Sequence, residues 1–447
     1  MIPYGAGINS ALAIGEQLGA TPGESAWIVA AYPLTQGTFV LMGGRIGAIY
    51  GHKNTVAFAG VWWVFWTLIS GFMTDMISLS ITRGLSGVGG AFIVPNAVAL
   101  LTITFPPGRM RNISVALFGA MAPVGAAGGS VFPGFFVQLL PWKWLFFFLA
   151  ILGAAIFTLF VMAVPEEPER MDPNGKIDFV GAYLGVAGLI LFNFVWNQAP
   201  NVAWDEPYEY ALLVVSILHI AAFAVWEAKF AKDPILPFDI WKAPSFGWMI
   251  VSAFFTCMAV GIILWYASVW NLELRHYSLF LNAAAYVPLT VCGAIAAILS
   301  AIAIRHLAAQ YIMAIASLAS AAALVLVCTM PEQQTYWAQM FPALILTALG
   351  PDFLFTASQI IASNTVKRSQ QGIAGSVIGT IVSYGLSTGL GFAGTVEVYT
   401  NSKGKNPVQG YRSAMYLGIG MAGCAAVIAL VFVRIPKDRK EGWDEEY

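Results

Sequence analysis

Long apolar runs separated by short polar segments extend along the whole chain. A helix needs roughly 20 apolar residues to cross the hydrocarbon core of a bilayer, and by this measure the pattern predicts thirteen membrane-spanning helices. Their expected ranges are 27–46, 56–73, 79–104, 113–139, 143–163, 179–198, 210–228, 246–268, 283–304, 309–329, 337–363, 371–395 and 414–433. Residues 1–15 are also apolar, but they are too short to cross and lack the basic segment of a signal peptide. We interpret them as the second half of a truncated first helix, which would bring the intact protein to fourteen spans.

The composition indicates that most of the protein's surface faces lipid. Hydrophobic residues make up 58% of the chain and charged residues 10%, whereas soluble domains have about 25% charged residues. The net charge of -1 argues against nucleic-acid binding, which requires a basic surface. The four cysteines lie in apolar runs, and no Cys/His spacing indicates a metal site. We expect no disulfide framework, no metal and no other cofactor.

Charges in the loops orient the chain. If residues 44–53 are cytoplasmic, alternation of the spans places sixteen Lys and Arg residues in the cytoplasm and five outside. An excess of Lys and Arg in cytoplasmic loops is the positive-inside rule, so we expect both termini in the cytoplasm. No retention or lipidation signal is visible, and the plasma membrane is therefore expected in preference to the vacuole.

Two longer polar loops divide the chain. Residues 165–178 and 230–245 contain Pro and several charges, which predicts cytoplasmic linkers. The expected units are an N-terminal helix bundle (1–164), two inserted helices (179–229), a C-terminal bundle (246–434) and a charged cytoplasmic tail (435–447). We expect the protein to be a monomer.

Residues 44–53, GRIGAIYGHK, form a short polar hinge between two apolar runs. The hinge resembles the loop signature of the major facilitator superfamily, G-x-L-x-D-x-x-G-R/K-R/K, between the second and third helices. The resemblance implies a cytoplasmic gate made of Gly44, Arg45, Gly51, His52 and Lys53. Ala48 occupies the acidic position of the signature, which puts the charge lock of the family in doubt. The alternative is a generic membrane turn rich in Gly and cations.

A second motif surrounds Arg83. The sequence RGLSGVGGA, residues 83–91, resembles the R-x-x-Q-G-x-G-A-A motif of the fourth helix in the same superfamily, with Ser86 in the Gln position. An Arg inside an apolar span costs at least about 2.5 kcal/mol, so it must face a wet cavity or a partner. The glycines allow close approach of another helix. The alternative is that Arg83 extends to the outer interface.

A third motif lies in the segment that corresponds to the fifth helix of the superfamily. Residues 119–129, GAMAPVGAAGG, resemble the antiporter signature G-x-x-x-G-P-x-x-G-G of drug:proton exporters. The corresponding residues are Gly119, Pro123, Gly128 and Gly129, although Ala122 replaces a Gly and the Gly pair comes two residues late. Small residues here would let this helix pack tightly against a helix of the other half, and Pro123 would provide a kink. Ordinary tight helix packing is the alternative.

Asp352 follows Gly350 and Pro351 near the middle of a span. Because burial favours the neutral form of a carboxylic acid, a lone acid at this depth is a candidate proton carrier. The alternative is a structural Asp satisfied by Ser358, Thr356 or a neighbouring helix. Four further intramembrane polar residues are candidates for lining a cavity, or for simple hydrogen bonding between helices: Gln36, Asn96, Asn193 and Gln359.

The span number and motifs resemble the fungal fourteen-helix drug:H+ antiporter family. Residues 25–53 and 350–364 look most like its aminotriazole-resistance and boron-efflux branch. The resemblance implies alternating access between two six-helix bundles, with a small-molecule substrate, protons and the lipid bilayer as partners. Export coupled to protons is the leading interpretation. The alternatives are a uniporter or importer without proton coupling, an inactive truncated copy, and, least favoured, a membrane-embedded enzyme, since acids and histidines do not cluster.

Overall fold

The structure is a computed structural model that describes residues 1–105, 109–165, 172, 175–202, 204–243, 245–365, 371–401 and 404–434. Its first helices are α1 (Ile2–Gln17), α2 (Pro22–Tyr50), α3 (His52–Ser70), α4 (Met76–Thr104), α5 (Arg109–Phe136) and α6 (Lys143–Ala163). A pair follows, α7 (Phe179–Val202) and α8 (Pro207–Lys229). The later helices are α9 (Phe246–Val269), α10 (Leu279–Ala285), α11 (Val287–His306), α12 (Ala309–Cys328), α13 (Met340–Thr365), α14 (Gln371–Thr400) and α15 (Pro407–Val431). A 3-10 helix, η1 (Phe238–Lys242), precedes α9, and a π-helical turn, η2 (Trp270–Leu274), follows it.

These sequences form helices because a chain in lipid must satisfy its backbone groups internally. Among the described residues, ten helical segments are long and apolar enough to cross a membrane. Polar residues mark several helix starts. Thr21 and Glu24 form a capping box at α2, in which the Glu24 N–H donates to Thr21 Oγ1 and the Thr21 N–H donates to Glu24 Oε2. At α4 the Ser78 N–H donates to Asp75 Oδ1, and this hydrogen bond lowers the pKa of the Asp75 carboxyl.

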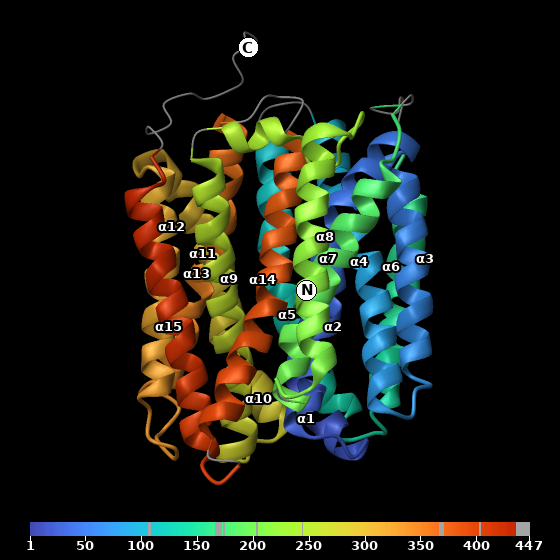
Figure 1. Cartoon of the computed structure of the whole chain (residues 1–447). Coiled ribbons are helices and arrows are strands. Elements are labelled where there is room, and N and C mark those ends of the chain that lie inside the picture. Colours follow the sequence, from blue (N-terminus) through green and yellow to red (C-terminus); the bar gives the residue numbers. More distant parts are fainter. Residues whose placement is uncertain are drawn as a thin grey trace.

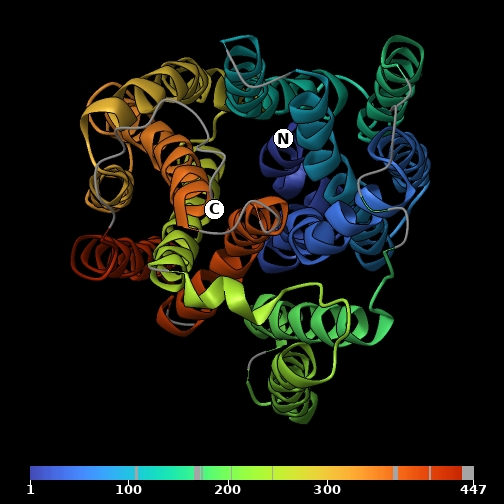
Figure 2. The ribbon, with the colours of Figure 1, turned by 90° about the horizontal axis from the view of Figure 1, so that it is seen from above.

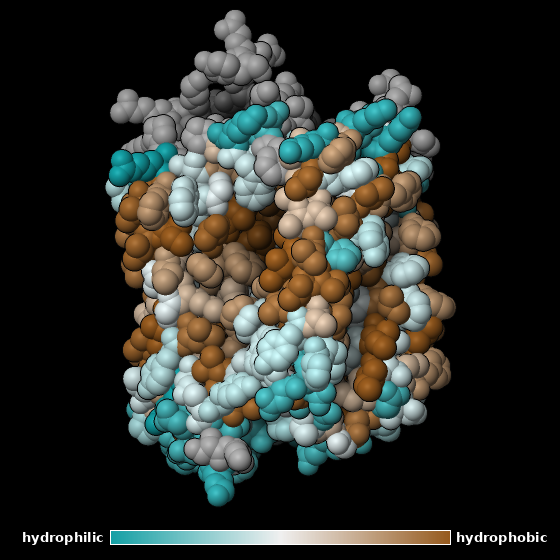
Figure 3. Space-filling view, in the orientation of Figure 1, coloured by the Kyte–Doolittle hydropathy of each residue, from teal (hydrophilic) through white to brown (hydrophobic). Residues whose placement is uncertain are grey.

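The long helices run side by side, and the chain alternates between the two ends of the bundle (Figure 1). We call the end that carries the Gly51 turn the upper end, and the end that carries loop 18–21 the lower end. Seen from above, α1–α6 and α9–α15 form two groups, with α7 and α8 outside them on one side (Figure 2). The α2 and α14 helices are in contact and join the two groups. Apolar side chains form a belt between polar ends (Figure 3).

Two predicted boundaries were wrong. The sequence predicted a hinge of about ten residues at 44–53, but α2 continues to Tyr50 and only Gly51 separates it from α3. Gly51 has a φ of 99°, a conformation that glycine adopts without a steric penalty. The predicted span 283–304 is divided at Tyr286 into α10 and α11. Pro288, in the first turn of α11, explains this break because it has no N–H to continue the preceding helix.

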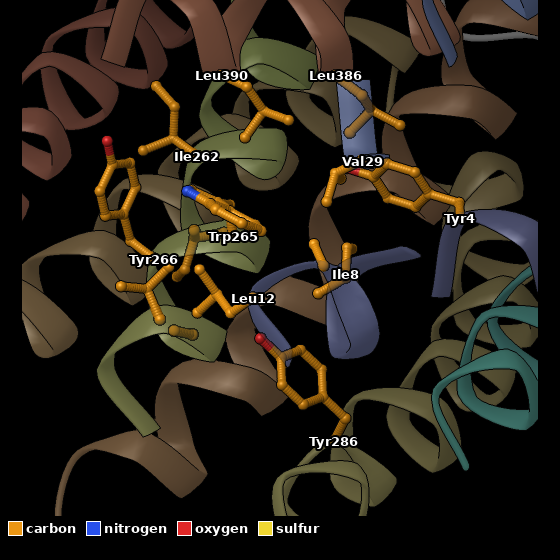
Figure 4. Packing of buried hydrophobic residues seen from close by; sticks show 14 of the residues in the cluster. Tyr4, Ile8, Leu12, Val29, Ile262, Trp265, Tyr266, Tyr286, Leu386 and Leu390 are labelled. Atoms are coloured by element: carbon orange, nitrogen blue, oxygen red, sulfur yellow. The ribbon is translucent and has the colours of Figure 1, made fainter. Parts of the chain in front are cut away.

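A buried apolar cluster joins the two groups of helices. It includes Ile8 and Leu12 of α1, and Trp265 of α9 together with Tyr286. Figure 4 shows the α1 side chains lying beside those of α9 and Tyr286. Because the cluster contains residues from both groups, separation of the groups at this level would expose apolar side chains.

Candidate functional site

A network of buried amide and hydroxyl side chains joins the two groups of helices toward the lower end. Asn9 Nδ2 of α1 donates to the backbone carbonyls of Ser130 in α5 and Leu279 in α10. Asn282 Nδ2 donates to Asn9 Oδ1 (2.8 Å) and Ser268 Oγ (2.8 Å). Asn271 Nδ2 donates to Asn282 Oδ1, and Ser268 Oγ of α9 donates to the Ile8 carbonyl. We call Asn9, Ser130, Ser268, Asn271 and Asn282 the lower-end network.

Two features of this network bear on its role. Four members, Asn9, Ser268, Asn271 and Asn282, are no more than 1% exposed, so they hydrogen-bond with protein groups rather than with solvent. No member is ionisable, so the contact between the groups does not depend on a salt bridge. The sequence gives no sign of this role for Asn9, because its partners lie up to 273 positions away.

A second network fastens α7 to α14, close to α2. Asn193 Nδ2 donates to Thr388 Oγ1 (2.8 Å), and Ser387 Oγ donates to Asn193 Oδ1 (2.9 Å) and to the Ala30 carbonyl of α2. Asn197 adds a hydrogen bond to the Ser387 carbonyl. Asn193 is fully buried, and its polar atoms are occupied by neighbouring helices. These contacts fit hydrogen bonding between helices, one of the two roles that the sequence left open for Asn193.

Arg83 of α4 is 3% exposed and lies between α1 and α2. Its Nε donates to the Ile28 carbonyl (2.6 Å), and its Nη2 donates to the Pro3 carbonyl (2.9 Å). The guanidinium also lies about 6 Å from the Tyr32 and Phe146 rings. Among the described residues no carboxylate forms a salt bridge with it. The expectation of a cavity-facing Arg83 is corrected here: backbone carbonyls and aromatic faces stabilise the charge inside the N-terminal group.

The upper-end motif is tied to the segment after α6. Arg45 Nη1 forms a salt bridge with Asp172 Oδ2 (2.8 Å), and the Arg45 guanidinium also donates to the Lys176 carbonyl. The Asp172 N–H donates to the Ala48 carbonyl (3.0 Å). Ala48 occupies the acidic position of the family signature, and a carboxylate from another segment therefore pairs with the motif Arg.

The remaining motif residues are packed against α4. His52 and Lys53 are 4% and 8% exposed, and His52 Nδ1 lies 2.6 Å from Asn96 Oδ1. Asn96 Nδ2 donates to the carbonyls of Gly43 and Phe92. The polar atoms of Asn96 thus connect α2, α3 and α4, which fits hydrogen bonding between helices, one of the two roles that the sequence left open for it. A Cβ at Gly44 would lie 2.9 Å from Ser376 Oγ of α14, so Gly44 lies at the contact between the two groups.

The antiporter-like motif of α5 lies against α1. A Cβ at Gly129 would clash with the backbone carbonyl of Ile2, whereas one at Gly128 would meet no atom of the described residues within 4 Å. The expected partner of this glycine pair was a helix of the other half, but the close approach at Gly129 is to α1 within the same group. Farther along α5, Gly134 approaches Phe280 of the C-terminal group. The surroundings of Gly119 and Pro123 lie outside the described side chains.

Asp352, Gln36 and Gln359 differ from the residues above. Each is half-buried, and among the described residues none has a side-chain hydrogen bond or ion pair. Thr356 Oγ1 donates to the backbone carbonyl of Asp352 and lies 2.9 Å from Ser300 Oγ, so neither hydroxyl reaches the carboxylate. The polar atoms of these three side chains remain available to water, protons or a solute.

A small cavity separates the two groups beside the lower-end network. Its volume is about 30 Å³, and Ile8 and Ser130 line it from one side and Leu264 and Tyr286 from the other. A cavity of this size holds one or two water molecules. Tyr4 also lines the cavity, and its buried hydroxyl has no hydrogen-bond partner among the described residues.

Fold and site together define a class: a multi-pass integral membrane protein whose two helix groups meet along buried polar contacts, as in a transporter. The sequence profile of the Major Facilitator Superfamily matches residues 4–391. The chain belongs to this superfamily.

Two relatives and one solved structure illustrate the similarity. The low affinity ammonium transporter of Saccharomyces cerevisiae is 37% identical over 96% of this chain and 85% of its own length. The aminotriazole resistance protein of the same yeast is 33% identical over 94% of this chain and 79% of its own length. A crystal structure of a POT family transporter in complex with a thioalcohol conjugated peptide has a TM-score of 0.69 at 12% identity, covering 96% and 91% of the two chains. That structure supports the fold alone.

These findings confirm the predicted all-α polytopic architecture and superfamily. The protein is a transmembrane transporter embedded in a lipid bilayer, with a small-molecule substrate.

Proposed function

We propose that this transporter exports a small solute in exchange for protons, by alternating access between the groups α1–α6 and α9–α15. The observation that supports this proposal most directly is Asp352. It is half-buried in α13 next to Pro351, and no described residue pairs with its carboxylate. A carboxylate that no described residue neutralises at this depth is stabilised by taking up a proton.

The other polar residues divide between proposed transport and structural roles. Gln36 and Gln359 are available to contact the solute, because each is half-buried and has no hydrogen-bond partner among the described residues. Arg83 is a structural residue that holds α1 and α2 against α4. The motif 44–53 acts as the gate at the upper end, with Asp172 in place of the missing acidic residue. The lower-end network closes the opposite side.

The proposed topology follows from the loop charges. The upper end faces the cytoplasm, because most Lys and Arg residues lie in its loops. The units are those expected from the sequence, with residues 179–229 inserted between two six-helix bundles. We place the protein in the plasma membrane as a monomer, within the fourteen-helix drug:H+ antiporter family.

The direction of transport has a competing proposal, uptake without proton exchange. A protein named for aminotriazole resistance suits export, whereas the name of the low affinity ammonium transporter gives no direction. Both relatives cover most of this chain, so similarity does not decide between the two. The direction of the coupled proton flow does.

The experiment reconstitutes the full chain in liposomes and measures accumulation of radiolabelled aminotriazole as the probe. One set of liposomes has an acidic lumen, a second has an acidic exterior, and a third has no pH difference; protein-free liposomes report passive entry. Exchange for protons predicts accumulation only when the lumen is acidic. Accumulation driven by an acidic exterior would instead indicate symport, and equal uptake in all three sets would indicate a uniporter.

A further inference from the structure

A carboxylate at the lower end of α14 has a specific partner inside the C-terminal group. Glu397 Oε2 accepts a hydrogen bond from the Tyr266 hydroxyl of α9 (2.7 Å). Tyr266 is 1% exposed, so solvent does not offer its hydroxyl an alternative acceptor. Glu397 lies three residues before the end of α14, a position where a carboxylate is usually solvated. Its pairing with a buried Tyr is therefore a feature that needs its own explanation.

The surroundings hold Glu397 close to three helices. A Cβ at Gly410 of α15 would lie 3.0 Å from Glu397 Cγ, so the glycine permits this close approach. The Tyr411 ring of α15 lies 5.9 Å from the Tyr266 ring. Among the described residues Glu397 forms no salt bridge. The titratable groups beside Glu397 are Tyr266 of α9, which donates to it, and Tyr411 of α15. The charged residues next to these elements along the chain are Glu273 and Arg275, Lys405 and Arg412. Of these cations, Arg275 donates to the Gln334 carbonyl, and Arg412 donates to the Met330 carbonyl and lies over the Trp270 ring.

Two members of the lower-end network, Ser268 of α9 and Asn271 of η2, follow Tyr266 closely along the chain. Tyr266 is two residues before Ser268 and five before Asn271, both of which hydrogen-bond with Asn282. Ser268 also donates to the Ile8 carbonyl in the opposite group. The helix changes to a π-helical turn at Trp270, and such turns occur frequently at functional sites. A displacement of Tyr266 therefore moves residues that join the two groups.

We propose that Glu397 is a proton-binding site that controls the lower-end network through Tyr266. The ionised carboxylate accepts a charge-assisted hydrogen bond from Tyr266 and holds the end of α9 in the closed arrangement. A proton taken from the medium at the lower end adds to one carboxylate oxygen, which leaves a weaker neutral acceptor for the hydroxyl. No other bond changes. A role for this proton in driving transport rests on the proposed function, but the conformational switch itself can be measured without a substrate.

The test measures the distance between the two groups at the lower end as a function of pH. Cysteines are introduced at two exposed residues, Gln17 of α1 and Trp337 of the α12–α13 loop. Spin labels on these cysteines report the distance by double electron–electron resonance in nanodiscs. The native cysteines Cys257, Cys292, Cys328 and Cys424 are first replaced by Ser. Size-exclusion profiles and thermal unfolding confirm that each variant is folded before its distances are compared.

In the unsubstituted background, acidification should increase the ratio of open to closed distances about fivefold, because a charge-assisted hydrogen bond is roughly twice as strong as a neutral one. Glu397→Gln keeps an acceptor but cannot bind a proton, so its ratio should stay at the acidic value at every pH. Tyr266→Phe should behave in the same way. The matched controls are Glu273→Gln, an exposed neighbouring acid, and Tyr411→Phe, and both should retain the pH response.

Two results would overturn the inference: no pH response in the unsubstituted background, or a normal response in Glu397→Gln. These outcomes are distinguishable from failure of the proposed function. Proton-driven accumulation of the probe together with a pH-independent distance would leave proton exchange in place and reject Glu397 as its switch. A pH-dependent distance without accumulation would do the reverse.

Discussion

Asn9→Ala removes the residue that connects most segments in the lower-end network. In the closed arrangement its side chain makes two hydrogen bonds to the opposite group, one to the Leu279 carbonyl and one from Asn282. A third bond, to the Ser130 carbonyl, lies within its own group and is independent of closure. The substitution should therefore destabilise the closed arrangement relative to an open one, rather than the fold as a whole.

The size of the effect follows from the two bonds between the groups. A hydrogen bond between membrane helices contributes about 0.6 kcal/mol on average, and a typical buried one about 1 kcal/mol. Loss of two shifts the equilibrium by about 1–2 kcal/mol, which corresponds to roughly a 5- to 30-fold increase in the ratio of open to closed molecules.

Cysteine labelling measures this ratio. Ile8 is 6% exposed and lines the cavity between the groups, so a cysteine at this position reacts with a maleimide only when the lower end opens. In a background without native cysteines, Asn9→Ala should raise the labelling rate of Ile8→Cys by the same 5- to 30-fold. Ser10→Ala is the matched control, because the Ser10 hydroxyl donates only to the Ala6 carbonyl of its own helix.

The reasoning would be refuted by equal labelling rates in Asn9→Ala and Ser10→Ala. A slower rate in Asn9→Ala would contradict it more strongly, since the network would then favour the open arrangement.

Three further substitutions test the packing. Arg83→Lys should lower the free energy of unfolding by about 1.5–3 kcal/mol, because one ammonium cannot reach both the Ile28 and Pro3 carbonyls; thermal unfolding in detergent measures this, and an unchanged midpoint would count against the two-carbonyl role. Gly391→Ala should lower the free energy of unfolding by about 1–3 kcal/mol, since its Cβ would lie 2.6 Å from the Trp196 backbone. Gly420→Ala is the control and should leave the free energy of unfolding unchanged, because its Cβ would meet no atom of the described residues within 4 Å. Equal midpoints for the two glycine variants would reject the α7–α14 contact. Asp172→Asn should cost no more than about 1 kcal/mol at low salt, because the Asp172 side chain is 40% exposed, and the cost should vanish at high salt; a large loss that salt does not reduce would show that the pair matters in another way.

The sequence could predict the spans because each helix in a bilayer must be apolar and must satisfy its own backbone. It could not predict where α2 ends. The glycines and cations of residues 44–53 suggested a loop, yet the Gly51 N–H still donates to the Gly47 carbonyl, so the helix continues to Tyr50. Composition reports the environment of a segment, whereas a helix end depends on the single residue that adopts a positive φ.

The partners of polar side chains were beyond the sequence for a different reason. The cost of burying Arg83 predicted that it needs a partner, but the carbonyls of Pro3 and Ile28 carry no signal in their residue types. Asn9 and Asn282 meet only because of how α1 and α10 align, and the sequence contains no record of that alignment. Glu397 looked solvated because it lies three residues from a helix end, and only the position of Tyr266 on α9 showed otherwise. Asp352 differs, since its depth alone made it a candidate.

The most direct test of proton-coupled export is Asp352→Asn in proteoliposomes, with two assays on the same preparation. The first measures accumulation of radiolabelled aminotriazole driven by an acidic lumen, and the second measures exchange of labelled for unlabelled probe without a pH difference. Loss of the accumulation with retention of the exchange is the result that this account predicts. Retention of both would contradict it, because Asp352 would then carry no coupled proton.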